Sequence, residues 1–198
     1  MEQEQEQTPD IYCGTITLVE GPMFSGKTTE LFRLLRRQKI ARKKVLAIKY
    51  LKDGKNILSN HNGHGFNDDE EIQTKEYVSL DTNLLADIIE NDVEVVGIDE
   101  GQFFVGLADA CDFLQKNGIS VIVAALSGTF ERKMWPEMIL LKPFVTYCTT
   151  LTAICDVCGE EAPYSKKIVN VRLSDGGQLE DIGGKEKYNA VCLKHYFI

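Results

Sequence analysis

Residues 21–28 read Gly-Pro-Met-Phe-Ser-Gly-Lys-Thr, which matches the G-x-x-x-x-G-K-[ST] pattern of a phosphate-binding loop. An apolar run over residues 15–20 precedes the motif and a helical pattern begins at Thr28, the strand–loop–helix setting that such a loop requires. Glycines let backbone N–H groups approach phosphate oxygens, the lysine adds positive charge, and the threonine hydroxyl is suited to Mg²⁺. The sequence therefore predicts a nucleoside triphosphate site formed by Gly21, Pro22, Met23, Phe24, Ser25, Gly26, Lys27 and Thr28.

A second acidic motif, Asp99-Glu100-Gly101-Gln102, follows the apolar run 93–98. An acid at the end of a buried strand is the Walker-B arrangement, so we expect Asp99 to lie beside the phosphate loop and to hold Mg²⁺ together with Thr28. Glu100 decides the reaction, because a carboxylate near the γ-phosphate can deprotonate either an acceptor hydroxyl or a water. On these residues alone, a kinase and an ATPase both stay open.

Two short motifs near the C-terminus have the spacing of metal knuckles. Cys155 and Cys158 form a C-x-x-C pair, and Cys192 and His195 form a C-x-x-H pair. Thiolates and imidazole are zinc ligands, and four protein ligands leave no place for a catalytic water. The sequence predicts a structural Zn²⁺ site; the alternative is a redox-active C-x-x-C with an unrelated Cys192.

The elements that must position these residues alternate between strand and helix. We expect strands at 15–20, 45–49, 93–98 and 120–126, and helices at 28–41, around 84–89 and at 107–116. Alternation of this kind predicts a parallel sheet with right-handed crossovers. Residues 52–71 are polar and are expected to form a loop that covers a site. Helical periodicity ends near Thr152, where a second, metal-stapled lobe is expected to begin.

Composition sets the outer limits on function. The chain has 198 residues, 43% of them apolar, and a net charge of −8, which argues against general nucleic-acid or membrane binding. Residues 1–13 form an acidic tail that we expect to be disordered. It resembles neither a secretory signal nor a transit peptide, so a cytoplasmic protein is expected.

Several segments taken together resemble type II thymidine kinase, the cytosolic, zinc-containing family, over residues from about 14 to 196. The segments that carry the resemblance are Gly-Pro-Met-Phe-Ser-Gly-Lys-Thr-Thr-Glu-Leu (21–31), Ile-Asp-Glu-Gly-Gln-Phe-Phe (98–104), Gly-Thr-Phe-Glu-Arg-Lys (128–133) and Ile-Gly-Gly-Lys-Glu-Lys-Tyr (182–188). The resemblance implies an α/β fold with a P-loop NTPase-like parallel sheet core at 14–152 and a small zinc-binding lasso domain at 153–198.

The resemblance also implies an activity. The protein would transfer the γ-phosphoryl group of ATP to the 5′-hydroxyl of thymidine, with deoxyuridine as a second substrate, and Glu100 would be the general base. The product, dTMP, belongs to nucleotide salvage for DNA synthesis. Mg²⁺ and a structural Zn²⁺ are the implied metals, and a homotetramer inhibited by dTTP is the implied regulated form.

The family's functional residues carry over to matching positions of this chain. For ATP these are the loop 21–28 with Asp53, Asp99 and Gln102. For the nucleoside they are Met23, Phe103, Leu126, Phe130, Trp135, Ser165, Leu179, Glu180, Asp181, Ile182, Gly183 and Tyr188. Aromatic rings stack on a flat pyrimidine while backbone groups read its polar edges. Taken singly, Phe103, Phe130 and Trp135 could equally be core residues.

Four features depart from the family pattern, and the first is Ser127, which stands where an Asp is usual before Gly-Thr-Phe. Met134-Trp135-Pro136 replaces a common Pro-Phe-Gly, Ser165 replaces a Thr, and His195 replaces a fourth Cys. The loss of one methyl group at Ser165 leaves the choice between thymidine and deoxyuridine open, because a methyl contributes only about 1–3 kcal/mol to discrimination.

Two functions of other classes compete with the nucleoside kinase. One is an ATPase or switch whose zinc lobe binds a protein partner, and the other is a zinc-ribbon nucleic-acid module with a vestigial nucleotide site. The acidic net charge and the lack of an aromatic and basic stripe after residue 155 argue against the nucleic-acid module.

Overall fold

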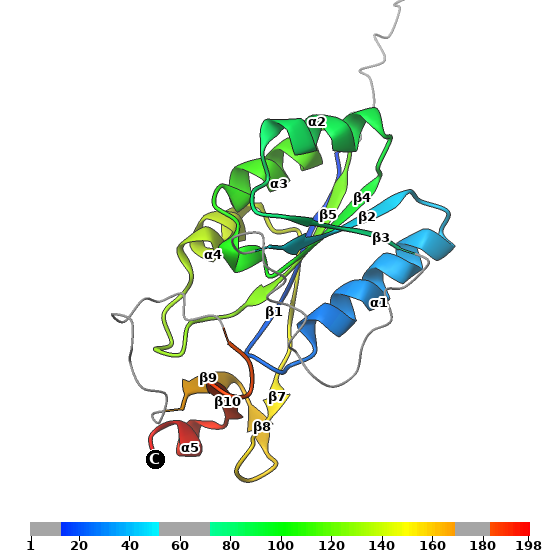
Figure 1. The fold of residues 1–198 in the computed structure, drawn as a ribbon. Helices are drawn as coiled ribbons and strands as arrows, with labels where there is room; N and C mark the ends of the chain where they lie inside the picture. The colour runs from blue at the N-terminus through cyan, green and yellow to red at the C-terminus, as the bar shows by residue number, and fades with distance from the viewer. Residues whose placement is uncertain (1–12, 52–71, 169–182) are drawn as a thin grey trace, which may run out of the picture.

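A six-stranded parallel sheet is the framework of the structure, a computed structural model that describes residues 13–51, 72–168 and 183–198 (Figure 1). The strand order is β3-β2-β4-β5-β1-β6. The strands are β1 (Ile16–Gly21), β2 (Val45–Tyr50), β3 (Gln73–Tyr77), β4 (Val95–Asp99), β5 (Ser120–Leu126) and β6 (Tyr147–Thr150). Because all the pairings are parallel, the carboxyl ends of β1 and β4 lie at the same edge of the sheet, on either side of β5.

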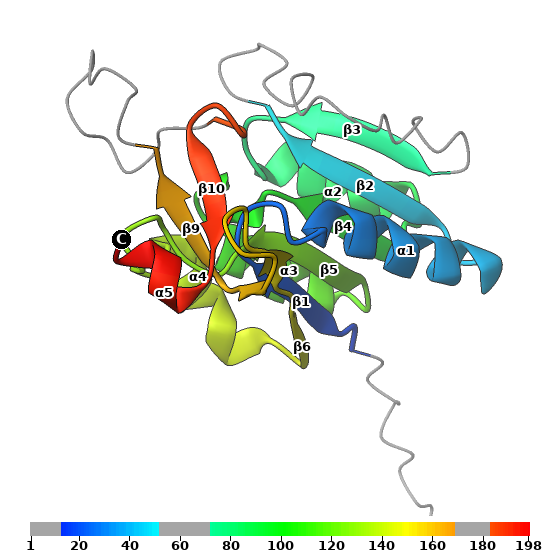
Figure 2. The ribbon, with the colours of Figure 1, turned by 90° about the horizontal axis from the view of Figure 1, so that it is seen from below.

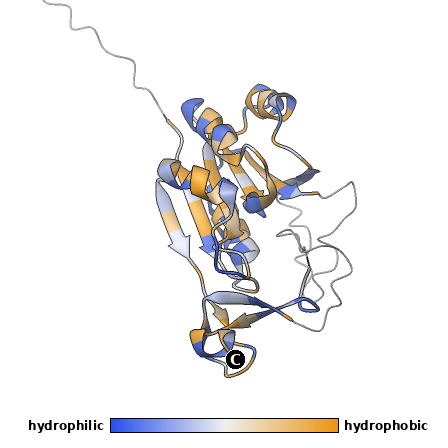
Figure 3. Cartoon of the chain, turned by 90° about the vertical axis from the view of Figure 1, so that its left-hand side faces the viewer, coloured by the Kyte–Doolittle hydropathy of each residue, from blue (hydrophilic) through white to orange (hydrophobic). Residues whose placement is uncertain are grey.

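Helices cover both faces of this sheet (Figures 1 and 2). Helix α1 (Lys27–Ile40) packs on one face, where Leu31 and Leu35 are fully buried. The other face carries α2 (Thr82–Glu90), α3 (Leu107–Lys116) and α4 (Pro136–Leu141), with short 3₁₀ turns at Gly101–Phe103 and Lys142–Phe144. The apolar residues gather on the strands and on the inner sides of the helices (Figure 3). Within the described ranges, no helix is long and apolar enough to cross a lipid bilayer.

A small lobe at the C-terminal end lies below the carboxyl edge of the sheet in Figure 1. Its elements are β7 (Ala153–Ile154), β8 (Glu161–Ala162), β9 (Tyr164–Lys167), β10 (Tyr188–Val191) and α5 (Leu193–Tyr196). Strand β7 pairs with β8 and β9 pairs with β10, both antiparallel. The apolar cluster of the lobe is built from small buried residues, namely Ala153, Cys155, Ala162, Ala190 and Val191. A core of this size needs a further constraint such as a bound metal.

The predicted alternation of strands and helices is confirmed. Helix α3 and strand β5 have the predicted bounds, and β1, α1, β2 and β4 differ from the predictions by one or two residues at their ends. The sequence did not reveal β3 and β6, because these edge strands lack a buried side. All four residues of β6 are exposed. The predicted loop at 52–71 and residues 1–12 of the predicted tail lie outside the described residues.

The packing of α1 on the sheet depends on a close approach at Gly97 in β4. A Cβ atom at position 97 would lie 2.5 Å from Cδ1 and 3.0 Å from Cδ2 of the fully buried Leu35. Contacts this short force the leucine side chain or the helix to move. The absence of a side chain at position 97 therefore limits how near α1 can lie to β4.

We predict that Gly97→Ala lowers the free energy of unfolding by about 1–3 kcal/mol, because the added methyl group overpacks the interface with Leu35. The measurement is urea denaturation of both single variants and of the double variant with Leu35→Ala. In the double variant the methyl group added at position 97 enters space that the Leu35 side chain has vacated. The double variant should therefore lose less stability than the sum of the losses in the two single variants. Strictly additive losses would contradict this explanation.

Candidate active site

The segment between β1 and α1 forms a compact loop at the carboxyl edge of the sheet. Gly26 has a φ of 82°, a left-handed conformation that glycine adopts without steric cost, directly before α1. Gly21 also has no room for a side chain, because a Cβ atom there would lie 2.7 Å from the carbonyl oxygen of Leu151. The Ser25 hydroxyl and the Lys27 ammonium group both donate hydrogen bonds to the carbonyl of Pro22, at 2.9 and 2.8 Å.

The start of α1 meets the end of β4 through two side chains. The hydroxyl of Thr28 lies 3.1 and 3.0 Å from the carboxylate oxygens of Asp99. Oxygen atoms of these two types are what Mg²⁺ prefers, and their distances allow one ion to be shared between them. The residues therefore fit the predicted magnesium site.

Burial dominates the electrostatics of this edge. Desolvation and the neighbouring carboxylate of Glu100 raise the pKa of Asp99 to about 7, against the opposing effects of the Thr28 hydroxyl and the Lys27 ammonium group. Burial lowers the pKa of Lys27, and the nearby carboxylates of Glu100 and Asp99 oppose that shift. A bound triphosphate would surround Lys27 with further negative charge and so favour its ammonium form.

Glu100 occupies an unusual backbone position between Asp99 and the 3₁₀ turn. Its φ is 57°, in the left-handed region that residues other than glycine seldom adopt. The side-chain amide of Gln102 donates to Oε2 of Glu100 at 2.6 Å, and its oxygen accepts from the N–H of Leu126 at 3.0 Å. Gln102, which lies in the 3₁₀ turn and is anchored to Leu126 on β5, thus orients the Glu100 carboxylate. An outlier backbone conformation at a fixed carboxylate is typical of a functional site.

The C-terminal lobe contacts the loop directly. Ser165 on β9 accepts a hydrogen bond from the backbone N–H of Met23 at 2.9 Å, and the Ser165 side chain is buried. Phe24, the next residue of the loop, packs against the small apolar core of the lobe. The structure therefore brings together Met23 and Ser165, which the family resemblance assigned to one nucleoside site from distant parts of the chain.

The predicted aromatic residues fall into two groups. The rings of Phe130 and Tyr188 lie 6.2 Å apart between the core and the lobe. Phe103 packs edge-on against Trp135, with ring centres 5.5 Å apart, and its ring is tilted against that of Tyr50, at 5.3 Å. Trp135 is only 8% exposed and belongs to the core between the sheet and α4. Its indole N–H has no hydrogen-bond partner among the described residues.

The four residues of the predicted metal site converge in the lobe. Their ligand atoms all lie within 4.8 Å of one another. Nδ1 of His195 is 3.6 Å from Sγ of Cys155 and 3.2 Å from Sγ of Cys192, and the sulfurs of Cys158 and Cys192 are 3.8 Å apart. Tetrahedral zinc with ordinary bond lengths requires about 3.8 Å between two sulfurs and about 3.6 Å between sulfur and nitrogen. The donor set and its spacing fit Zn²⁺.

Backbone N–H groups around this cluster favour the thiolate form of Cys155. Burial disfavours ionisation of Cys155, but the backbone N–H groups of Cys192, Val157 and Cys158 outweigh it and lower the pKa of Cys155 to about 6. A thiolate, rather than a thiol, is the form that binds a metal ion. Gly159 follows the first knuckle with a φ of 77°, which lets the chain turn back toward β8.

The comparison with known proteins agrees with this geometry. The family model for thymidine kinase matches residues 14–196. The chain belongs to the thymidine kinase family. It is 42% identical to the cytosolic thymidine kinase of Bos taurus over 194 residues, which cover 96% of this chain and 75% of that protein. It is also 42% identical to the thymidine kinase of Myxoma virus (strain Lausanne), covering 94% and 98% of the two chains, and 41% identical to that of Yaba monkey tumor virus, covering 93% and 95%.

Some predicted site residues of this thymidine kinase family member cannot be placed. Asp53, Leu179, Glu180, Asp181 and Ile182 lie outside the described residues. Gly183 is described and lies at the start of the turn that leads into β10.

Sequence reasoning also missed one contact, in which the hydroxyl of Tyr196 donates to the carbonyl of Phe130 at 2.7 Å. The only sequence signal for Tyr196 is an aromatic residue directly after the last metal ligand.

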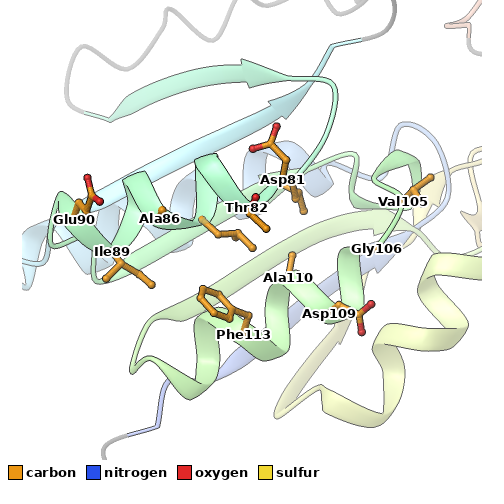
Figure 4. Close-up of a pocket in the computed structure, with 12 residues that line it drawn as sticks. Asp81, Thr82, Ala86, Ile89, Glu90, Val105, Gly106, Asp109, Ala110 and Phe113 are labelled. Carbon is orange, nitrogen blue, oxygen red and sulfur yellow. The ribbon is translucent and has the colours of Figure 1, made fainter.

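A hollow of about 700 Å³ lies elsewhere, between α2 and α3 (Figure 4). Its walls include apolar side chains such as Leu85, Ile89 and Phe113, and its rim carries Asp81 and Asp109. None of the residues that line this hollow belongs to the predicted active site, so the hollow is separate from that site.

The raised pKa of Asp99 predicts how the stability of the nucleotide-free protein depends on pH. The unfolded chain loses the Asp99 proton near pH 4, whereas the folded chain keeps it until about pH 7. The contribution of Asp99 to stability therefore falls as pH rises from about 4 to about 7, and is constant above that. Asp99→Asn removes this dependence.

The measurement is urea denaturation between pH 4.5 and 8.5. As pH rises, the free energy of unfolding of Asp99→Asn should increase relative to that of the unsubstituted protein by a few kcal/mol, and this gap should become constant above about pH 7. Asp87→Asn, at an exposed position on α2, is the matched control for removing a carboxylate. A gap that stays constant from about pH 5 upward would show that Asp99 is ionised in the folded protein throughout.

Proposed function

We propose that the protein transfers the γ-phosphoryl group of ATP to the 5′-hydroxyl of thymidine, giving dTMP, and that it accepts deoxyuridine as a second substrate. The observation that carries the proposal is the meeting of Thr28, Asp99 and Glu100 at the carboxyl edge of β4, beside a phosphate-binding loop. Membership in the thymidine kinase family supports the same substrates. Synthesis of dTMP by this route is a step of nucleotide salvage.

ATP would bind with its phosphates on the loop 21–28, where Lys27 and the N-terminus of α1 supply positive charge. Thr28 and Asp99 would hold Mg²⁺, which neutralises charge on the phosphates when it is bound. Asp53 and Gln102 would lie near the phosphates. Gln102 would also keep the Glu100 carboxylate in a fixed orientation, since their side chains are 2.6 Å apart.

Glu100 would act as the general base on the 5′-hydroxyl. Phosphoryl transfer needs little covalent work from the protein, so catalysis depends on orienting the nucleophile and stabilising charge. A thymidine 5′-hydroxyl held against Glu100 directs the phosphoryl group to the sugar rather than to water. The ATPase reaction, the alternative that the residues alone leave open, requires a water at the same position.

Thymidine would bind between the loop, the sheet edge and the lobe. The proposed contacts are Met23, Phe103, Leu126, Phe130, Trp135, Ser165, Gly183 and Tyr188, together with Leu179, Glu180, Asp181 and Ile182. The pairing of Met23 with Ser165 and of Phe130 with Tyr188 supports this site. The burial of Trp135 beneath Phe103 favours a supporting position for it behind the pocket.

Cys155, Cys158, Cys192 and His195 would bind a structural Zn²⁺, since four protein ligands complete a tetrahedral site. We further propose two domains, an ATP-binding domain at 14–152 and a zinc-binding domain at 153–198, with residues 1–13 as a disordered tail. A homotetramer, inhibition by dTTP and a cytoplasmic location complete the proposal, and the resemblance to the cytosolic family supports them.

The first test is Glu100→Gln. Loss of the base should lower the rate of thymidine phosphorylation by about 100-fold or more, while the affinity for Mg²⁺ and ATP stays within about threefold. Product formation from thymidine, deoxyuridine, deoxycytidine and purine deoxynucleosides is measured, together with ADP release without any nucleoside. Glu90→Gln, exposed on α2, is the control. Full turnover in Glu100→Gln would show that Glu100 is not the general base. ADP release by the unsubstituted protein without a nucleoside would favour the ATPase reaction.

Removal of the metal tests the second part of the proposal. We expect one zinc per chain, and we expect a chelator to unfold the lobe and abolish thymidine binding while part of the ATP affinity is kept. Cys158→Ser should have the same effect, whereas Cys148→Ser, at an exposed cysteine outside the cluster, should keep its zinc. Zinc content by elemental analysis and thymidine affinity by calorimetry are the measurements. Thymidine binding that persists after complete zinc loss would contradict the role of the lobe.

A further inference from the structure

Arg132 lies against three aromatic rings of the C-terminal lobe. Its guanidinium carbon is 4.6 Å from the ring centre of Tyr196, 4.9 Å from that of Phe197 and 5.7 Å from that of Tyr164. The rings also pack on one another, with Tyr196 5.7 Å from Tyr164 and 5.4 Å from Phe197. A cation that contacts several aromatic faces is held by the sum of these attractions. Arg132 therefore joins the core loop on which it lies to the lobe.

Tyr196 connects the same contact to the metal cluster. It directly follows His195, and its backbone N–H donates to the carbonyl of Cys192 at 3.0 Å. Its hydroxyl donates to the carbonyl of Phe130 at 2.7 Å, so one side chain contacts both Phe130 and Arg132. The backbone of Tyr196 is thus held beside Cys192 and His195, the last two residues of the proposed metal site.

The loop on which Arg132 lies is the turn 129–133, and internal hydrogen bonds hold it together. The N–H of Thr129 donates to the carbonyl of Lys133 at 2.8 Å, and the N–H of Arg132 donates to the carbonyl of Thr129 at 2.9 Å. The buried hydroxyl of Thr129 accepts from the N–H groups of Glu131 and Lys133, both at 3.2 Å. A turn closed by four hydrogen bonds moves as one unit. Phe130, within this turn, faces Tyr188.

We propose that Arg132, stacked on Tyr196, Phe197 and Tyr164, is a positioning residue that sets the place of Phe130 in the thymidine site. It acts through the turn 129–133 and makes thymidine affinity depend on the folded state of the metal lobe. This rests on the proposed function, because Phe130 matters only if thymidine binds there.

Shape as well as charge matters in this contact. A planar guanidinium lies flat on aromatic rings, whereas an ammonium group is a compact and strongly hydrated point charge. Arg132 also has a φ of 60°, so its backbone adopts a conformation that an arginine accepts only when other contacts compensate. Arg132→Lys should therefore restore only part of what Arg132→Gln loses.

The adjacent Lys133 provides a matched control. It lies on the same turn and carries the same charge, but its side chain is 71% exposed and pairs with Glu131 at 2.7 Å. We expect Arg132→Gln to raise the KM for thymidine by about 5- to 30-fold, with kcat and the KM for ATP changed by less than about threefold. Lys133→Gln should leave all three constants unchanged. Equal values of the thymidine KM in the two variants would overturn the proposal.

Two further measurements separate positioning from unfolding. Zinc content should be unchanged in Arg132→Gln, and a loss of zinc that parallels the loss of thymidine affinity would overturn the proposal. Tyr196→Phe keeps the ring beneath Arg132 and removes only the hydrogen bond to Phe130, so a smaller rise in the thymidine KM is expected. The same KM as the unsubstituted protein would contradict the part assigned to that bond.

Amide hydrogen exchange tests the contact of Arg132 with the lobe without depending on the proposed thymidine kinase activity. The amides of residues 129–133 should exchange faster in Arg132→Gln than in Lys133→Gln, whether or not a nucleoside is present. If the unsubstituted protein phosphorylates no thymidine, the proposed function fails while the exchange rates still show whether Arg132 holds the turn. Equal exchange rates in the two variants would overturn the proposal, as would faster exchange with an unchanged thymidine KM.

Discussion

Burial of opposite charges at one edge of the sheet is the constraint on which the rest of the structure depends. The Glu100 carboxylate lies close enough to raise the pKa of both Asp99 and Lys27, and Lys27 and Asp99 are both largely removed from solvent. Charges in such a place are stable only when neighbours compensate them. The Pro22 carbonyl and the Thr28 hydroxyl provide that compensation in the protein alone. The strand order, the tight loop and the close packing of α1 on β4 all serve to hold these groups together.

The C-terminal lobe is linked to this edge by few but direct contacts. Ser165 bonds to the backbone of Met23, Phe24 packs into the lobe, and Tyr196 reaches Phe130. These contacts lie at the loop 21–26 and at the turn after β5, which both belong to the proposed substrate site. A lobe with so small an apolar core can keep these contacts only if another interaction stabilises it, and the Cys and His cluster is suited to that purpose.

The residues of the candidate site were easier to recognise in the sequence than the contacts that pack around them. Phosphate binding fixes residue types and spacing locally, so the loop 21–28 and the acid after β4 can be recognised from the residues alone. The same holds for Cys155 and His195, whose motifs have the spacing that a shared ion requires. Buried elements such as α3 and β5 were also predicted well, because burial imposes a clear apolar pattern.

Contacts between distant segments have no such local signal. The bond between Tyr196 and Phe130 joins residues 66 positions apart, and nothing around either residue indicates the other. Trp135 satisfies the pattern of a pocket residue and that of a core residue, and the structure places it in the core beneath Phe103.

The left-handed backbone at Glu100 places stability and activity in opposition at a single residue. Glycine would adopt a φ of 57° without steric cost, whereas a residue with a side chain loses about 1 kcal/mol there. The chain instead has its glycine one position later, where a Cβ atom would lie 2.6 Å from Val123. Selection for stability alone would favour glycine at position 100 as well. The presence of glutamate indicates that the protein has kept a carboxylate at this point at the expense of a more stable turn.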